Sequence, residues 1–157
     1  SSAIGFWSEF IDYPKKHVEL IGVEAKYCAP LTTNAKLAIL HGAAQYCLTD
    51  KNGQIKETHS ISAGLDYPGV SPLHCFLKDT GRARYCSASD QQALAAFKLV
   101  TKLEPSVKPS LEPAHCLHEV IRLAPKLNKD EIIIYNNCGH AYKDQKIIKD
   151  RIGYFPS

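Results

Sequence analysis

Segments typical of strands alternate along the chain with segments typical of helices, and this alternation limits the fold more than any other feature of the sequence. The strand-like segments lie at residues 17–24, 83–88 and 131–136, and the first and the last of them are rich in β-branched residues. Amphipathic or capped helices are expected at residues 2–12, 72–80, 89–103, 112–123 and in a final stretch after residue 139. Because such alternation is typical of sheets with crossover helices, it predicts an α/β fold. We expect a three-layer α/β/α sandwich with a mostly parallel, twisted sheet.

Three local patterns refine this expectation. The segment 131–136, Glu-Ile-Ile-Ile-Tyr-Asn, is the clearest candidate for a central strand. The Asn-Gly step within residues 50–53 predicts a β-hairpin that joins residues 44–49 to residues 54–59. Residues 25–42 carry weak signals, so irregular chain is expected there.

Size and charge exclude several classes of protein. A chain of 157 residues suits one domain, residues 1–157, with one core. The net charge of +3 is too small to indicate a nucleic-acid partner, and no basic stripe is interleaved with aromatic residues. No apolar run approaches the roughly 20 residues of a membrane helix, and no signal peptide is visible. We therefore expect a cytoplasmic protein without nucleic-acid or membrane partners.

The six cysteines do not form a recognisable framework. None belongs to a C-x-x-C pair, and the gaps between them are long and irregular, which favours reduced and mostly buried thiols. A metal or thiol-redox role remains a weaker alternative, suggested by the pairs His74-Cys75 and His115-Cys116, although adjacent residues point in different directions on a helix. The cysteines are Cys28, Cys47, Cys75, Cys86, Cys116 and Cys138.

The residue pattern alone indicates where a ligand would bind on the sheet, but it does not indicate which reaction the protein catalyses. The sequence contains no phosphate-binding glycine loop, nucleophile elbow or zinc-binding helix motif. In parallel sheets, ligands bind beyond the carboxyl ends of the strands. The loops after Glu24, Ala88 and Asn136 are therefore the expected binding edge.

A longer pattern is more specific. The run from His59 to Pro72, which contains Asp66-Tyr67-Pro68, resembles a substrate-facing loop of tryptophan synthase beta chains. Other segments match that family in the same order and spacing: Ala3–Gly5, Leu20–Glu24, Leu40–Gly42, Gly53–Glu57, Gly81–Tyr85, Ala93–Phe97 and Leu111–His115. The resemblance covers nearly the whole chain, and it corresponds to the C-terminal part of a beta chain.

The resemblance implies a fold, an activity and partners. Residues 1–157 would be the C-terminal domain of a two-domain, fold type II enzyme that depends on pyridoxal phosphate. The complete protein would be a carbon–oxygen lyase that makes L-tryptophan from indole and L-serine. Its partners would be its own N-terminal domain, a second beta chain in a dimer and a tryptophan synthase alpha chain. The lysine that forms a Schiff base with the cofactor belongs to the N-terminal domain, so the isolated chain is expected to be inactive.

The resemblance also assigns catalytic and cofactor-binding residues. Asp66 matches the loop aspartate that closes over the substrate, and Glu112 matches a glutamate near the cofactor ring and the indole site. Ser1 and Ser2 stand at the end of the phosphate-binding loop, where Ser2 replaces an asparagine. By residue type alone, Asp66 is explained more simply as a turn residue, and Glu112 is explained equally well as a carboxylate that favours a helix N-terminus.

The remaining assignments concern the cofactor ring, a cation and the indole passage. Cys138 stands where the family has a serine that bonds the pyridine nitrogen, and Gly139 keeps the adjacent turn. The backbone carbonyls of Tyr67 and Gly69 match positions that bind a monovalent cation. Leu40 and His41 match the stretch that lines the indole passage.

A second interpretation stays open because the C-terminal third departs from the family pattern. Cys138, Tyr142 and residues 104–110 differ from what the family carries there. These differences are also compatible with a degenerate, non-catalytic homologue that acts as a binding or assembly protein.

Overall fold

The computed structural model describes residues 2–156 and confirms the α/β class, with 40% of the chain helical and 17% in strands. Its contacts divide the chain into two compact units. Unit 1 comprises residues 1–60 and 65–87, and unit 2 comprises residues 61–64 and 88–157. Each unit has its own cluster of buried apolar side chains.

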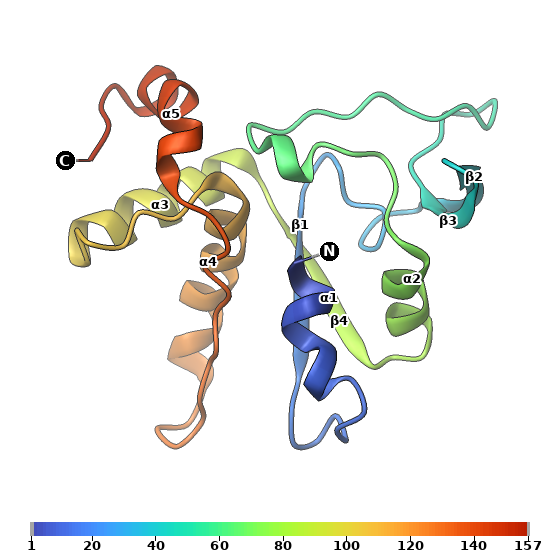
Figure 1. The fold of residues 1–157 in the computed structure, drawn as a ribbon, viewed down its shortest axis with the longest axis horizontal. Helices are drawn as coiled ribbons and strands as arrows, with labels where there is room; N and C mark the ends of the chain where they lie inside the picture. The colour runs from blue at the N-terminus through green and yellow to red at the C-terminus, as the bar shows by residue number, and fades with distance from the viewer. Residues whose placement is uncertain (1, 157) are drawn as a thin grey trace. The chain divides into compact units, whose positions relative to one another are not determined.

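The centre of unit 1 is a pair of parallel strands, β1 (Leu20–Ala25) and β4 (Ala83–Ala88). A short helix, α1 (Ser2–Trp7), continues as the 3-10 turn η1 (Ser8–Phe10) and lies across this pair (Figure 1). The helix packs there because its last residue carries the large apolar ring of the cluster. The buried members of this cluster are Trp7, Leu20, Leu77 and Ala83.

Gly22 in β1 allows an aromatic side chain to approach the strand. A Cβ atom at this position would lie 2.6 Å from Cδ1 of Tyr85 and 3.3 Å from Cη2 of Trp7. Tyr85 also forms a hydrogen bond of 2.9 Å between its hydroxyl and Nδ1 of the buried His74. The glycine is therefore needed for packing at this point, since its backbone is extended and requires no positive φ.

The hairpin of unit 1 lies earlier in the chain than the sequence predicted. Strand β2 (Lys36–Leu40) pairs antiparallel with β3 (Ala43–Cys47), with Leu40 opposite Ala43. The two turn residues, His41 and Gly42, have φ values of 51° and 77°, the positive values that a two-residue hairpin turn requires. The expectation of irregular chain over residues 25–42 is therefore wrong for its second half.

The Asn-Gly step does form a turn, but the strands predicted beside it do not. Gly53 has a φ of 81°, and Asp50 accepts a backbone hydrogen bond of 3.2 Å from its N–H. Beyond this turn the two arms share a single bridge, between Thr49 and Ile55. The predicted hairpin here is wrong in extent. One edge of β3 pairs with β2, and beyond its other edge Cys47 bridges Gly69 and the N–H of Leu48 donates to the carbonyl of Pro68.

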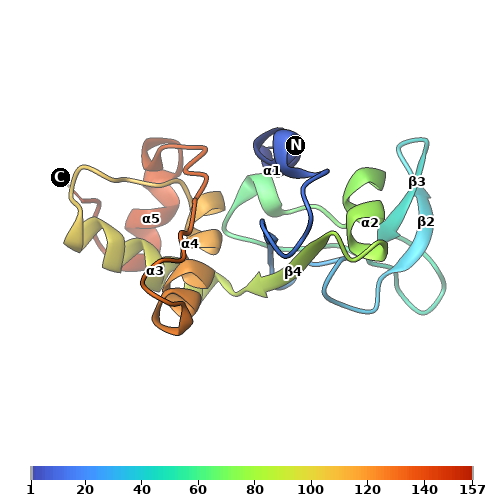
Figure 2. The ribbon, with the colours of Figure 1, turned by 90° about the horizontal axis from the view of Figure 1, so that it is seen from below.

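Helix α2 (Pro72–Asp79) packs beside this hairpin, as Figure 2 shows. The hydroxyl of Ser71 caps its first turn by accepting from the N–H of His74 at 3.5 Å. Gly81, with a φ of 67°, ends it and leads into β4. The predicted helix is confirmed.

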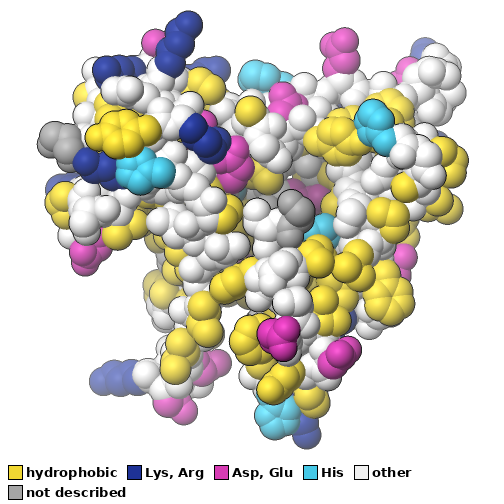
Figure 3. All heavy atoms as spheres, in the orientation of Figure 1, with side chains coloured by type: hydrophobic (Ala, Val, Ile, Leu, Met, Phe, Trp, Pro, Cys, Tyr) yellow, Lys and Arg dark blue, Asp and Glu magenta, His cyan; other side chains and the backbone are white. Residues whose placement is uncertain are grey.

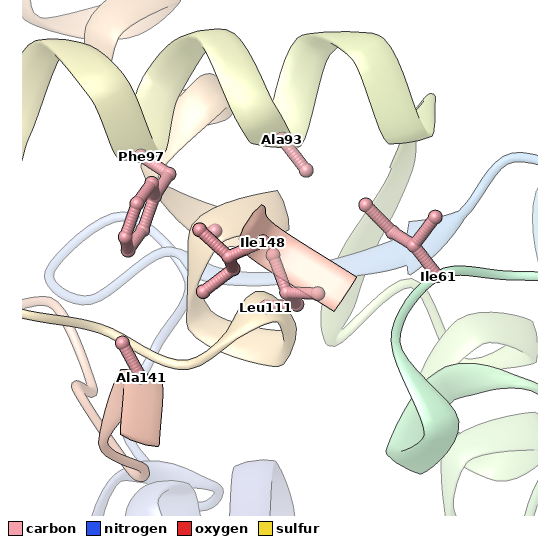
Figure 4. Close-up of a cluster of buried hydrophobic side chains, with 7 residues drawn as sticks. Ile61, Ala93, Phe97, Leu111, Ala141 and Ile148 are labelled. Atoms are coloured by element: carbon pink, nitrogen blue, oxygen red, sulfur yellow. The ribbon is translucent and has the colours of Figure 1, made fainter. Parts of the chain in front are cut away.

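Unit 2 is mainly helical. It contains α3 (Asp90–Leu103), α4 (Leu111–Leu123) and α5 (Gln145–Ile152), with 3-10 turns η3 (Ala124–Lys126) and η4 (Ala141–Asp144). The predicted capping box at the start of α3 is present, because Ser89 and Gln92 satisfy each other's backbone N–H groups. Figure 4 shows the core between these elements. Its members are Ile61, Ala93, Phe97, Leu111, Ala114, Ala141 and Ile148.

The segment 131–136, predicted to be the central strand, is not a strand in the structure. It has no regular secondary structure, and within residues 2–156 no ladder or bridge involves it. Ile132 and Ile134 are 85% and 70% exposed, whereas Ile133 and Tyr135 are partly buried. Figure 3 shows apolar side chains along this part of unit 2. The prediction fails because a strand needs a partner for its backbone groups, and none of the described segments provides one.

Two further points complete the description. The 3-10 turn η2 (Ala63–Leu65) interrupts the loop before Asp66. Among residues 2–156, no helix combines the length and the apolar character that crossing a membrane would require.

Candidate functional site

Asp66, in unit 1, is an exposed carboxylate with several hydrogen-bond donors. Its pKa is lowered, first by the side-chain hydrogen bond from Thr58 and also by those from Cys28 and the backbone of Ser60, although burial acts in the opposite direction. The thiol of Cys28 donates to Oδ1 at 3.4 Å. The side chain is therefore ionised at neutral pH and held by its own unit.

The structure brings the loop after Asp66 against the tip of the β2–β3 hairpin. The ring of His41 stacks on that of Tyr67, with centroids 6.0 Å apart and planes inclined by 20°. A Cβ atom at Gly69 would lie 3.1 Å from Cδ2 of Leu40 and 3.4 Å from Sγ of Cys47. The residues predicted to line the indole passage thus contact the residues whose carbonyls were predicted to bind a cation.

Glu24, at the carboxyl end of β1, is an ionisable group that the sequence reasoning did not single out. Its carboxylate accepts from the N–H of Leu31 at 3.1 and 3.2 Å and from the hydroxyl of Thr32 at 2.9 Å. Burial raises the pKa of Glu24 to about 7 despite these bonds. Its place at the end of a buried strand is the sequence signal that points to it, since the loop that follows was already expected at the binding edge.

His74 is the second ionisable group of unit 1 with a large shift. Burial lowers the pKa of His74 to about 4, so the imidazole is neutral at physiological pH. Burial also raises the pKa of Tyr85, the partner of His74, well above its ordinary range. His74 and Tyr85 are therefore both uncharged, and the hydrogen bond between them lies within the aromatic packing of unit 1.

Glu112 lies in the first turn of α4, in unit 2. It accepts from the N–H of Gly64 at 3.0 Å and from the hydroxyl of Ser110 at 2.8 Å, and it pairs with Nζ of Lys143 at 2.8 Å. Burial raises the pKa of Glu112, but these donors, Lys143 foremost, outweigh burial and lower it to about 2. Glu112 is therefore a permanently charged carboxylate with fixed geometry.

Lys143 connects Glu112 to a second carboxylate. Its Nζ lies 2.9 Å from Oδ1 of Asp144, whose side chain is 5% exposed. The other oxygen of Asp144 accepts from the N–H of Leu111 at 2.8 Å, at the start of α4. Lys143 and Asp144 thus meet Glu112 at the helix N-terminus, which favours negative charge.

Gly139 and Cys138 lie next to the same helix N-terminus. The carbonyl of Gly139 accepts from the N–H of Ser110 at 2.8 Å, and a Cβ atom at Gly139 would lie 2.5 Å from Oγ of Ser110. A side chain is therefore excluded at this position. Because Ser110 also bonds Glu112, the structure brings two predicted parts of the site together, and Cys138 beside them is exposed.

The structure describes only some of the residues that were predicted to bind the cofactor, and these belong to different units. Ser2 opens α1 in unit 1, whereas Cys138 and Gly139 belong to unit 2, and Ser1 lies outside the described residues. Glu112 and Asp66 also belong to different units.

The cysteines are all free thiols. Cys28, Cys47 and Cys75 are buried, as predicted, whereas Cys86 and Cys116 are partly buried and Cys138 is exposed. Across residues 2–156, no three histidine, cysteine or acidic side chains are grouped so that they could hold a metal ion.

Comparison with known proteins gives a consistent result, although no family model matches the chain. The chain is 49% identical to a tryptophan synthase beta chain of Allorhizobium ampelinum over 92% of its length. It is 45% identical to those of Cereibacter sphaeroides and Chromobacterium violaceum, over 98% and 92% of its length. It spans 36% to 39% of the length of these relatives. Over the residues that the comparisons cover, the chain belongs to the tryptophan synthase beta chain family.

Proposed function

We propose that the chain is the C-terminal domain of a tryptophan synthase beta chain, a lyase that as a complete protein makes L-tryptophan from indole and L-serine with pyridoxal phosphate. The observation that carries this proposal is the arrangement around the N-terminus of α4. There Glu112 is held charged by Lys143 and Ser110, next to Gly139 and the exposed Cys138. The relatives named above supply the family context.

The residues around Ser110 fit the ring side of the cofactor. When bound, pyridoxal phosphate would supply the electron sink for the reaction of serine. Cys138 would bond the pyridine nitrogen through its thiol, which is a weaker hydrogen-bonding group than the hydroxyl that the family carries there. Gly139 leaves room there because no side chain fits against Ser110. Ser1 and Ser2 would contribute to the phosphate side.

Asp66 and its surroundings would serve the substrates. Asp66 is ionised and exposed, so it can accept hydrogen bonds from a bound substrate when its loop closes. The carbonyls of Tyr67 and Gly69 would bind a monovalent cation. Leu40 and His41, packed against this loop, would line the path of indole.

The complete protein would need parts that this chain does not supply. These are an N-terminal domain with the Schiff-base lysine, a second beta chain and, as a further partner, an alpha chain. We expect the 157 residues alone to be inactive, because the chain spans under two fifths of the length of its relatives.

The test uses the full-length protein with serine, indole and pyridoxal phosphate, and measures tryptophan formation. Asp66→Asn should lower turnover by about tenfold or more, the cost of losing one charge-assisted hydrogen bond to the substrate, and it should impair turnover more than folding. Asp12→Asn is the matched control, since Asp12 is also exposed in unit 1. Unchanged turnover in Asp66→Asn would exclude a role for Asp66.

A second candidate function is a non-catalytic binding or assembly protein. It is favoured by the departures from the family pattern at residues 104–110, Cys138 and Tyr142. Residues 108–110 hydrogen-bond to residues 139–141, which lie between the other two departures in the sequence. Tyr142 is 63% exposed and stacks on His140 and Phe155. Full-length protein that shows neither a Schiff-base absorption band with pyridoxal phosphate nor tryptophan formation would favour this candidate.

A further inference from the structure

Unit 2 contains a chain of polar contacts that starts at a buried carboxylate and ends at the loop before Asp66. We propose that Lys143 is a positioning residue that fixes Glu112 between Asp144 and the backbone of Gly64. Lys143 thereby couples Glu112, the carboxylate expected near the cofactor ring, to the segment Ile61–Gly64. This inference rests on the proposed function for its catalytic consequence. Its geometric part concerns only residues of unit 2.

Asp144 provides the fixed end of this chain of contacts. Its side chain is 5% exposed, and Oδ2 accepts from the N–H of Leu111 at 2.8 Å. That N–H belongs to the first turn of α4 and has no partner within the helix. Asp144 therefore cannot move without uncovering a donor of α4, so its Oδ1 is a rigid anchor for Lys143.

Lys143 is the cation that lies between the two carboxylates at the N-terminus of α4. Its Nζ lies 2.9 Å from Oδ1 of Asp144 and within 2.8 to 2.9 Å of both oxygens of Glu112. Without the ammonium, the two negative groups would repel each other and Glu112 would turn toward solvent. Lys143 is 48% exposed at its side chain, so this contact is expected to affect position more than stability.

Gly64 is the other end of this chain of contacts. Its N–H donates to Oε1 of Glu112 at 3.0 Å, and a Cβ atom at this residue would lie 2.6 Å from the same oxygen. The loop therefore approaches Glu112 as closely as only glycine allows. Ile61, at the start of the same segment, is buried in the core of unit 2, and Asp66 follows Gly64 by two residues in sequence. Holding Glu112 in place therefore fixes the segment from which the substrate loop departs.

The experiment compares Lys143→Met, Lys143→Arg and the control Lys146→Met in the full-length protein. Lys146 is an exposed lysine of α5, three residues further along the chain. The first readout is hydrogen exchange of the peptide that covers residues 61–64, with and without the cofactor. The second is the separate measurement of kcat and of KM for serine in tryptophan formation.

We expect Lys143→Met to speed exchange at residues 61–64 by about tenfold or more, the factor that loss of a charge-assisted hydrogen bond gives. It should lower kcat more than it raises KM for serine, because Glu112 is misplaced whereas Asp66 keeps its own hydrogen bonds in unit 1. Lys143→Arg should restore slow exchange, and Lys146→Met should change neither readout.

Unchanged exchange in Lys143→Met, or an equal effect in Lys146→Met, would overturn the inference. If Lys143→Met does not fold, Glu112→Gln replaces it: it should speed exchange at residues 61–64 with Lys143 intact, and unchanged exchange would overturn the inference equally. A wild-type protein that makes no tryptophan would refute the proposed function instead, because the exchange readout does not depend on activity.

Discussion

Replacing Gly22 by alanine tests the packing of unit 1 directly. The new Cβ atom would lie 2.6 Å from the ring of Tyr85, about 1 Å inside an ordinary carbon–carbon contact. The ring cannot turn away freely, because Trp7 lies against it and its hydroxyl is bonded to His74 at 2.9 Å. Overpacking of this kind costs about 1–3 kcal/mol, and loss of the hydrogen bond adds about 1 kcal/mol. We expect Gly22→Ala to lower the free energy of unfolding by about 2–4 kcal/mol.

Urea unfolding of the 157-residue chain measures this loss, and the single tryptophan, Trp7, reports on the same cluster. Gly5→Ala is the matched control: nothing lies within 4 Å of its Cβ position in α1, so stability should rise by about 0.5–1 kcal/mol. In a Tyr85→Leu background, Gly22→Ala should cost much less, because the opposing ring is gone. A loss from Gly22→Ala that is the same in both backgrounds would refute the argument that the ring causes it.

Three further outcomes are expected. In Glu24→Gln, the stability of unit 1 should rise from pH 4.5 to 6.5, because His74 has a lowered pKa and the unfolded state therefore binds more protons over this range. In His74→Gln, the stability should fall over the same range, because Glu24 has a raised pKa and the folded state binds more protons. Wild type should vary less, since the two effects oppose each other, and a flat urea-midpoint profile for Glu24→Gln would contradict this. Ser89→Ala should cost about 1 kcal/mol by removing the cap of α3, and Ser87→Ala, at an exposed position of β4, should not. Ile134→Asp should change the free energy of unfolding of the 157-residue chain by less than about 0.5 kcal/mol, because Ile134 is exposed there. It should destabilise the full-length protein by more if another segment pairs with residues 131–136 there. Equal effects in the two proteins would refute such a pairing.

Glu24 and Lys143 show why part of the candidate site was not predictable. Sequence comparison with the family pointed to Asp66 and Glu112 because their neighbours match in order and spacing. It gave no reason to connect Glu112 to Lys143, which lies 31 residues away and donates to it at 2.9 Å. The raised pKa of Glu24 depends on burial by the loop that folds back over it, and residue order does not contain that information.

The sequence by itself determined the features that rest on neighbouring residues. Strand β4 and helix α3 lie where they were expected. For α3 the reason is local, because a capping box and an amphipathic run act within one or two turns of the helix. Tertiary structure alone decided the others. The extended hairpin formed at His41, whereas the arms of the Asn52-Gly53 turn share one bridge, because the free edge of β3 meets Gly69 at Cys47. Residues 131–136 have the composition of a strand and remain without a ladder, because backbone hydrogen bonds in a sheet require a second segment, and composition cannot supply it.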